Sequence, residues 1–177
     1  PLPAALVALA NLVPVAAYPF LKRITWWPQL WLGLVFSWGA LVGWAAIARG
    51  LGGPALWLYA GAILWVTGYD TIYALQDLED DALAGIKSSA RRLGRHVRAG
   101  IALWYFAALA CWSVALWLVR PDPLAPVALA PAALHLGWQV STLRARDPAD
   151  ALLKFRSNRF AGLLVFLACV TVGTGAG

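Results

Sequence analysis

The 177-residue chain is 62% hydrophobic and only 12% charged, and its mean hydropathy is +0.70. A soluble domain is roughly 45–50% apolar and about 25% charged, so this composition excludes a soluble globular protein and indicates a membrane protein. The formal charge of +6 is then informative through its distribution along the chain, and it does not indicate a nucleic-acid partner.

Six stretches of about 20 mostly apolar residues are long enough to cross the roughly 30 Å hydrocarbon core as helices. They cover residues 2–21, 29–48, 54–76, 99–119, 124–142 and 160–176. Glycine, proline and charged residues separate them, as expected for connections between helices. We therefore expect an all-α fold, a polytopic bundle of transmembrane helices that forms one domain over residues 1–177.

The basic residues are distributed unevenly over the five connections. The first, third and fifth connections hold 12 of the 14, whereas the second and fourth hold only Arg49 and Arg120. Because connections rich in lysine and arginine stay in the cytoplasm, the first, third and fifth are expected there, with both chain ends on the opposite side. The expected location is a bacterial inner (plasma) membrane, with the active-site loops facing the cytoplasm.

The stretch YDTIYALQDLEDDALAGIKSS, residues 69–89, holds five of the eight acidic residues. On a helix that continues from the third apolar stretch, Asp77 and Asp81 are four residues apart, and Asp70 and Tyr73 precede them on the same stripe. Ionised groups beside hydrocarbon are costly unless they are neutralised. Mg²⁺, which takes one or two carboxylates and completes its shell with water and phosphate oxygens, suits this pair. A solvated helix end at the membrane boundary would contain the same acids.

Basic residues accompany the acids on the same side of the membrane. The segment GIKSSARRLGRHVR follows them and contains Lys87 with several arginines, which are residues that bind phosphate. At the end of the first apolar stretch, YPFLKR places Tyr18 four residues before Lys22, with Arg23 beside it. Alone, this cluster is typical of an interfacial aromatic with snorkelling cations. Together, the acids and cations predict a binding site for a metal-bridged polyphosphate.

Other polar and sulfur-containing residues receive simpler interpretations. Cys111 and Cys169 lie in apolar stretches without CxxC spacing and are expected to be small buried hydrophobes. His135 lies in an apolar stretch and is expected to be a hydrogen-bonded packing residue.

Three segments resemble one family. YDTIYALQDLEDDALAGIKSSARRLG resembles the second aspartate-rich motif of the UbiA-type membrane prenyltransferases, most of all in their 4-hydroxybenzoate polyprenyltransferase branch. AYPFLKR is similar to the tyrosine-xxx-lysine segment of the family, and FRSNRFAGLLVF, which contains Asn158, to the opening of its last helices. The three matches occur in family order and span nearly the whole chain.

The resemblance implies a reaction and a site. The family transfers a polyprenyl group from polyprenyl diphosphate to the ring carbon ortho to the hydroxyl of 4-hydroxybenzoate, in ubiquinone biosynthesis, within membrane lipid. Asp77 and Asp81 would hold Mg²⁺ against the diphosphate, with Asp70 as a third catalytic residue. The implied substrate-binding residues are Tyr18, Lys22, Arg23, Tyr73 and Lys87.

The family fold has nine helices and a first aspartate-rich motif, which these 177 residues lack. The resemblance therefore implies six spans of nine, with about three helices and half of the metal site missing at the N-terminus, and an inactive isolated chain. The alternatives are a haem, homogentisate or naphthoate prenyltransferase of the same superfamily. An ion- or proton-coupled transporter, in which Asp70 and Asp77 form the ion site, is a less favoured alternative.

Overall fold

The computed structural model describes residues 1–174, with the side chain of Lys22 excepted, and every regular element within them is a helix. The helices of the first half are α1 (Leu2–Ala10), α2 (Leu12–Ile24), α3 (Pro28–Phe36), α4 (Gly39–Ala48), α5 (Gly53–Tyr73), α6 (Leu78–Leu83) and α7 (Ser89–Leu93). A short 3₁₀ turn, Gly94–His96, is followed by α8 (Val97–Val119), α9 (Leu124–Val127), α10 (Ala130–Thr142) and α11 (Pro148–Thr174). The all-α prediction is confirmed.

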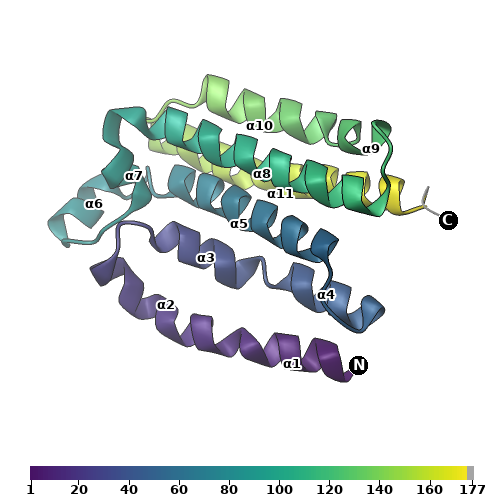
Figure 1. Cartoon of the computed structure of the whole chain (residues 1–177). Coiled ribbons are helices and arrows are strands. Elements are labelled where there is room, and N and C mark those ends of the chain that lie inside the picture. Colours follow the sequence, from purple (N-terminus) through teal and green to yellow (C-terminus); the bar gives the residue numbers. More distant parts are fainter. Residues whose placement is uncertain (175–177) are drawn as a thin grey trace.

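The six predicted spans correspond to six helical rods that lie side by side (Figure 1). Three rods are the single helices α5, α8 and α11, and three consist of two shorter helices each: α1 with α2, α3 with α4, and α9 with α10. Four segments are long and apolar enough to cross a membrane: Leu2–Leu21, Pro28–Ala48, Ser89–Val119 and Pro148–Thr174. The rods formed by α5 and by α9 with α10 do not meet both conditions, so a count of six spans stays a prediction. Residues 175–176 of the last predicted span lie outside the described residues.

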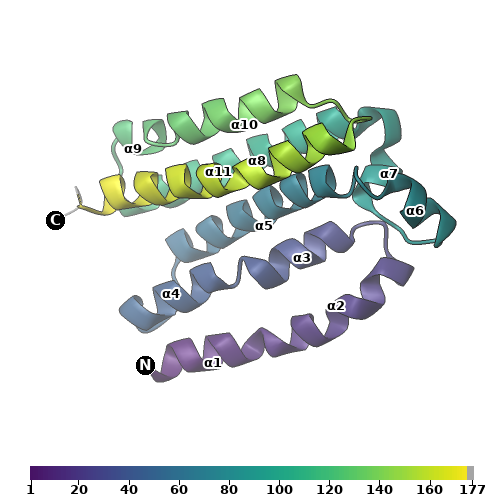
Figure 2. The same ribbon diagram turned by 180° about the vertical axis from the view of Figure 1, so that it is seen from behind.

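The connections alternate between the two ends of the bundle (Figures 1 and 2). The α2–α3 connection, the segment with α6 and α7, and the α10–α11 connection lie at one end, which we call the basic end. The chain start, the end of α11 and the two remaining connections lie at the other end. The basic end carries 12 of the 14 lysines and arginines, so the alternation predicted from charge is confirmed.

Helix α5 lies in the middle of the bundle and packs mainly against α8 and α3. Small residues permit this close approach. A methyl group on Gly68 would lie 2.5 Å from the ring of Tyr105, and one on Gly61 would lie 2.9 Å from the carbonyl oxygen of Ala108. The buried rings of Tyr105 and Trp112 on α8 fill the space that these glycines leave, so the position of α5, which leads to the acidic segment, is fixed by packing.

The acidic segment is not one continuous helix, and this prediction was wrong. Helix α5 ends at Tyr73, tightened turns follow, and α6 begins at Leu78 after Asp77, whose φ of −106° and ψ of 17° are not helical. Acids at a helix C-terminus oppose the macrodipole, whereas acids in a first turn are stabilised by it. Because of the break, Glu79, Asp80 and Asp81 lie in the first turn of α6 and not at the C-terminus of a longer helix, so the helix dipole stabilises them.

Candidate active site

A cavity of about 190 Å³ lies at the basic end, between α2, the start of α3, the end of α5, and helix α6 with the loop that follows it. Six of the eight predicted site residues line it: Tyr18, Asp70, Tyr73, Asp77, Asp81 and Lys87. The structure therefore brings together residues that lie up to about seventy positions apart in the sequence. We call this space the carboxylate cavity.

Two predicted site residues are not placed in the cavity. The Arg23 side chain is exposed and does not line the cavity. The side chain of Lys22 lies outside what the structure describes. The roles predicted for these two residues therefore stay predictions.

Asp77 caps the start of α6, and Asp81 lies four residues later in its first turn, so the two remain close together despite the break after α5. The backbone N–H of Asp81 donates to the carbonyl oxygen of Asp77 over 2.8 Å, which closes the first turn of α6. Asp70, in contrast, lies on α5, so the three carboxylates come from two separate helices. The carboxylates of both segments line one small cavity.

Arg91 holds the loop that follows α6, a role that sequence reasoning missed. Its guanidinium donates to the backbone carbonyl of Asp81 over 3.2 Å and also to the carbonyl of Ile86. The same guanidinium lies 5.6 Å from the ring centroid of Trp26, within cation–π range. Arg91 therefore ties the acidic segment to the α2–α3 connection.

Lys87 makes a parallel link between these two connections. Its ammonium donates to the carbonyl oxygen of Ile24 over 3.1 Å and lies 5.9 Å from the Trp26 ring centroid. The Trp26 ring thus lies within cation–π range of both Lys87 and Arg91. A lysine held at the mouth of a space lined by carboxylates matches the mixed charge expected for binding a metal-bridged polyphosphate.

Gln29 is a second cavity residue that sequence reasoning missed. Its side chain is buried, and its Oε1 accepts from the backbone N–H of Ser89 over 3.0 Å. The Ser89 hydroxyl in turn lies 2.7 Å from that of Thr71 on α5. The signal available in the sequence was a glutamine at the start of an apolar stretch, where a polar group needs a partner.

The donor set of the cavity fits a hard divalent cation. Asp70, Asp77 and Asp81 offer carboxylate oxygens, and Mg²⁺ needs only one or two protein carboxylates when phosphate oxygens and water complete its shell. Among the described residues, no group of three or more histidine, cysteine or acidic side chains is close enough to hold a metal alone.

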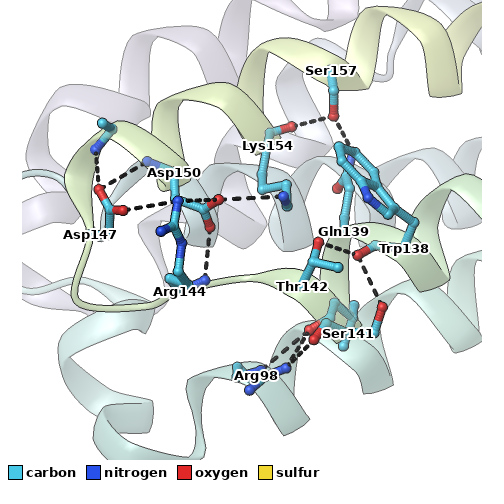
Figure 3. A network of polar contacts seen from close by, with 12 residues as sticks. Arg98, Trp138, Gln139, Ser141, Thr142, Arg144, Asp147, Asp150, Lys154 and Ser157 are labelled. Carbon is cyan, nitrogen blue, oxygen red and sulfur yellow. Dashed lines mark hydrogen bonds and ion pairs between the residues drawn. The ribbon is translucent and has the colours of Figure 1, made fainter.

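A second polar network crosses the basic half of α10 and α11 (Figure 3). Asp150 and Lys154, both buried, form an ion pair of 3.4 Å one turn apart on α11. The Asp150 carboxylate also accepts from the backbone N–H of Arg144 over 2.8 Å, and the Lys154 ammonium lies 4.2 Å from the ring centroid of Trp138. The two buried charges are therefore paired and further stabilised, as burial requires.

Asn158 joins three helices of this network, which gives a physical role to a residue first noted from family resemblance. Its Oδ1 accepts from the indole N–H of Trp65 on α5 over 2.9 Å, and its amide donates to Gln139 of α10 and to the Lys154 carbonyl. Gln139 also accepts from the Tyr105 hydroxyl over 2.7 Å. These bonds fix the positions of α5, α8, α10 and α11 relative to one another.

The histidine and cysteine interpretations are tested by the same contacts. The Nε2 of His135 lies 3.2 Å from the Ser157 carbonyl and 3.3 Å from the Gln139 amide, so the prediction of a hydrogen-bonded packing residue is confirmed. Cys111 and Cys169 are free thiols and half-buried, less enclosed than expected.

Comparison with curated proteins gives a consistent set of relatives. The chain is 40% identical over 167 residues to a mitochondrial 4-hydroxybenzoate polyprenyltransferase of Caenorhabditis elegans, which covers 93% of the chain and 46% of the relative. It is 44% identical over 164 residues to the human protein of that name (90% and 43%) and 40% identical over 169 residues to that of Arabidopsis thaliana (91% and 40%). The chain thus spans less than half the length of these relatives. No solved structure matches the chain.

These relatives correct the predicted location. They are named mitochondrial enzymes and come from animals and a plant, which contradicts the bacterial inner membrane expected from the sequence. The prediction was wrong because hydropathy and the distribution of basic residues report insertion and orientation, and neither identifies the organelle.

The family itself follows from a match over nearly the whole chain. The model of the UbiA prenyltransferase family matches residues 1–172, which include the carboxylate cavity and the network around Asn158. This agrees with the three resemblances quoted from the sequence and with identities of 40 to 44% to the relatives above. The chain therefore belongs to the UbiA prenyltransferase family.

Proposed function

We propose that the protein transfers a polyprenyl group from polyprenyl diphosphate to the ring carbon ortho to the hydroxyl of 4-hydroxybenzoate, a step of ubiquinone biosynthesis. The observation that carries the proposal is the carboxylate cavity, where Asp70, Asp77 and Asp81 meet Lys87 in a chain of this family. The names of the curated relatives support this choice of acceptor.

In the proposed site the aspartates act through a divalent cation. Asp77 and Asp81, with Asp70 nearby, would hold Mg²⁺, which neutralises diphosphate oxygens and makes the diphosphate a better leaving group. Two lysines and one arginine of the basic end would add charge-assisted hydrogen bonds to the same oxygens: Lys22, Lys87 and Arg23.

The proposed reaction is an electrophilic substitution on the acceptor ring. The allylic C–O bond of the donor breaks, and its electron pair leaves with the diphosphate. The ring carbon of the acceptor forms a new bond to the resulting allylic carbon, and the ring then loses a proton. Tyr18 and Tyr73 line the cavity, and their ring faces would stabilise the developing positive charge.

We also propose that these residues supply one half of the site. The first aspartate-rich motif of the family, which the 177 residues do not contain, would supply the other half. Residues 1–177 would accordingly belong to a single transmembrane prenyltransferase domain with further helices before them. On this proposal the 177-residue chain assayed alone has no transferase activity.

The test is transfer by the full-length protein in lipid nanodiscs, with labelled 4-hydroxybenzoate, a polyprenyl diphosphate and Mg²⁺. Asp77→Asn and Asp81→Asn should each lower kcat at least 100-fold, because each removes a proposed metal ligand. Asp80→Asn is the matched control, since Asp80 is an exposed acid of the same helix that does not line the cavity.

Two results would contradict the proposal. Undiminished transfer by Asp77→Asn would remove this residue from the site. Transfer to homogentisate or a naphthoate in place of 4-hydroxybenzoate, measured in parallel, would support prenyltransferase activity but contradict the proposed acceptor.

A further inference from the structure

A groove of about 280 Å³ lies between α8 and α10. Both helices contribute apolar residues to its walls, among them Ala102, Phe106, Leu109, Leu136, Gly137 and Val140. Space remains on its α10 side, because a methyl group on Gly137 would meet no atom within 4 Å. We call it the α8–α10 groove.

The surface around this groove suits contact with hydrocarbon. Three large apolar side chains of the same two stretches of helix are 63 to 76% exposed: Leu103, Phe106 and Leu134. An exposed apolar surface of this kind marks contact with a membrane or with another protein. The groove is therefore a place where an apolar chain can lie against two helices at once.

Arg98, the second residue of α8, lies at the basic end of the groove. Its guanidinium donates to the carbonyl oxygen of Val140 over 3.1 Å and to that of Ser141, and both of these residues line the groove (Figure 3). The dipole of α10 favours a cation at its C-terminal end. The bonds come from Nε and Nη2, and Nη1 makes no hydrogen bond within the described part of the chain.

The positive charge of Arg98 has no acidic partner. No carboxylate lies within 4.0 Å of it among residues 1–174, and the acids of the α10–α11 connection already pair with Arg144 and Lys154. Two further exposed arginines lie on the segments that meet here, Arg95 just before α8 and Arg146 after α10. This end of the groove therefore attracts an anion.

The arrangement has the polarity of a phospholipid. From Ser141 to Ala133 the groove follows α10 for about 12 Å, at 1.5 Å per residue. A cation thus lies at the end of the bundle that is rich in lysine and arginine, and an apolar groove runs from it toward the middle of the bundle. Basic pockets between transmembrane helices on this side of a membrane bind anionic lipid headgroups.

We propose that the α8–α10 groove binds an anionic phospholipid, with its phosphate on Arg98 and one acyl chain along the groove past Phe106 and Gly137. The lipid contacts α8 and α10 together and so stabilises their packing. The inference goes beyond the proposed function, because the groove shares no lining residue with the carboxylate cavity.

A free phosphate ion and a second copy of the chain are the other candidate occupants. A phosphate ion would bind Arg98 and leave the apolar groove without an occupant. A transmembrane helix is about 10–12 Å across, so it would rest on the exposed side chains and would not enter a groove of this volume. The lipid is favoured because it uses both the cation and the groove.

The experiment measures the equilibrium binding of spin-labelled phosphatidylglycerol and phosphatidylcholine to the delipidated full-length protein in detergent. We expect wild type to bind phosphatidylglycerol about tenfold more tightly than phosphatidylcholine. Arg98→Gln should abolish this preference by raising Kd for phosphatidylglycerol. Arg92→Gln, which removes an exposed arginine of α7 that lines neither the groove nor the carboxylate cavity, is the matched control and should keep the preference.

A second variant leaves Arg98 and its bonds to α10 in place. Gly137→Phe fills the groove and should raise Kd for both lipids about fivefold or more. Leu134→Phe, at an exposed position of the same helix that does not line the groove, should bind both lipids like wild type. Inorganic phosphate in large excess should displace neither lipid.

Several results would overturn the proposal. Equal Kd values for the two lipids in wild type, or an unchanged preference in Arg98→Gln, would remove the headgroup site. Displacement of the lipid by inorganic phosphate would show an anion site that makes no use of the groove. If Gly137→Phe instead dissociates a dimer in analytical ultracentrifugation and leaves both Kd values unchanged, the groove is a contact between copies of the chain.

Discussion

The ring of Tyr73 at the end of α5 packs against the ring of Phe155 on α11, with 4.8 Å between their centroids. Tyr73 borders the carboxylate cavity, and Phe155 belongs to the helix whose buried network fixes α10 and α11. The position of a site residue at the basic end is therefore supported by a helix that comes about eighty residues later in the chain.

Replacing Phe155 should change acceptor use more than stability. In Phe155→Leu the Tyr73 ring loses its aromatic neighbour and becomes more mobile, so we expect KM for 4-hydroxybenzoate to rise several-fold. The free energy of unfolding should fall by only about 1 kcal/mol. Steady-state kinetics with both substrates measures the effect. Phe166→Leu, an exposed phenylalanine of the same helix, is the control and should behave like wild type.

Removal of divalent metal should stop the reaction without unfolding the protein. The three aspartates line a cavity at the basic end and are not part of the buried core. A chelator should therefore reduce transfer to background, and added Mg²⁺ should restore it, with the thermal unfolding temperature unchanged. Full activity in excess chelator would show that the carboxylates act without a metal.

The Asp150–Lys154 pair should be strongly coupled. Asp150→Asn or Lys154→Met alone leaves one buried charge without its partner and should lower the free energy of unfolding by about 2 kcal/mol. The double variant should recover much of this loss, because no unpaired charge remains. A double-mutant cycle on thermal or denaturant unfolding measures the coupling. The ion pair of Arg120 and Asp122 is partly exposed, so the same kinds of substitution there should lower the free energy of unfolding much less. Equal losses at the two pairs would contradict the role given to burial.

Asn158→Ala should destabilise the junction of α5, α10 and α11. The substitution leaves the Trp65 indole N–H without its acceptor and removes a donor to Gln139, at a cost of about 1–3 kcal/mol. The intrinsic emission of Trp65, read as the difference between this variant and Asn158→Ala/Trp65→Phe, should report its changed surroundings. An unfolding curve identical to that of wild type would exclude a structural role for Asn158.

The contact between Gly68 and Tyr105 should tolerate no methyl group. Gly68→Ala places a carbon 2.5 Å from a buried ring, so helices α5 and α8 must separate, at a cost of about 1–3 kcal/mol. Gly137→Ala on α10 is the matched control, because nothing lies within 4 Å of its added carbon. It should be neutral or stabilise by up to about 1 kcal/mol through helix propensity. Thermal unfolding of both variants makes the comparison.

Hydropathy predicted the rods of this fold because burial in lipid demands long apolar helices, and basic residues predicted the alternation of their connections. The break before α6 was missed because the apolar periodicity of the sequence continues through it. The signal against one continuous helix was electrostatic: the acids would lie at the C-terminus of that helix, where its dipole opposes negative charge. The motif spacing identified Asp77 and Asp81, which share one short segment.

The contacts made across the bundle could not be predicted in the same way. Arg91 acts on backbone carbonyls, and a guanidinium that binds carbonyls leaves no pattern in the sequence. Gln29 meets Ser89 sixty residues later. Trp65 and Asn158 likewise meet across 93 residues, a pairing that depends on how the helices pack.

The position of Asp150 and Lys154 within a single helix also bears on how α11 enters the bilayer. Because they are one turn apart, helical backbone alone brings their charges together, without a contact from α10 or α5. A lone charge moved into hydrocarbon costs several kcal/mol, whereas a neutral pair costs less. Helix α11 thus provides the counterion of Lys154 from its own sequence, so the neutralisation of this buried charge needs no residue of another helix.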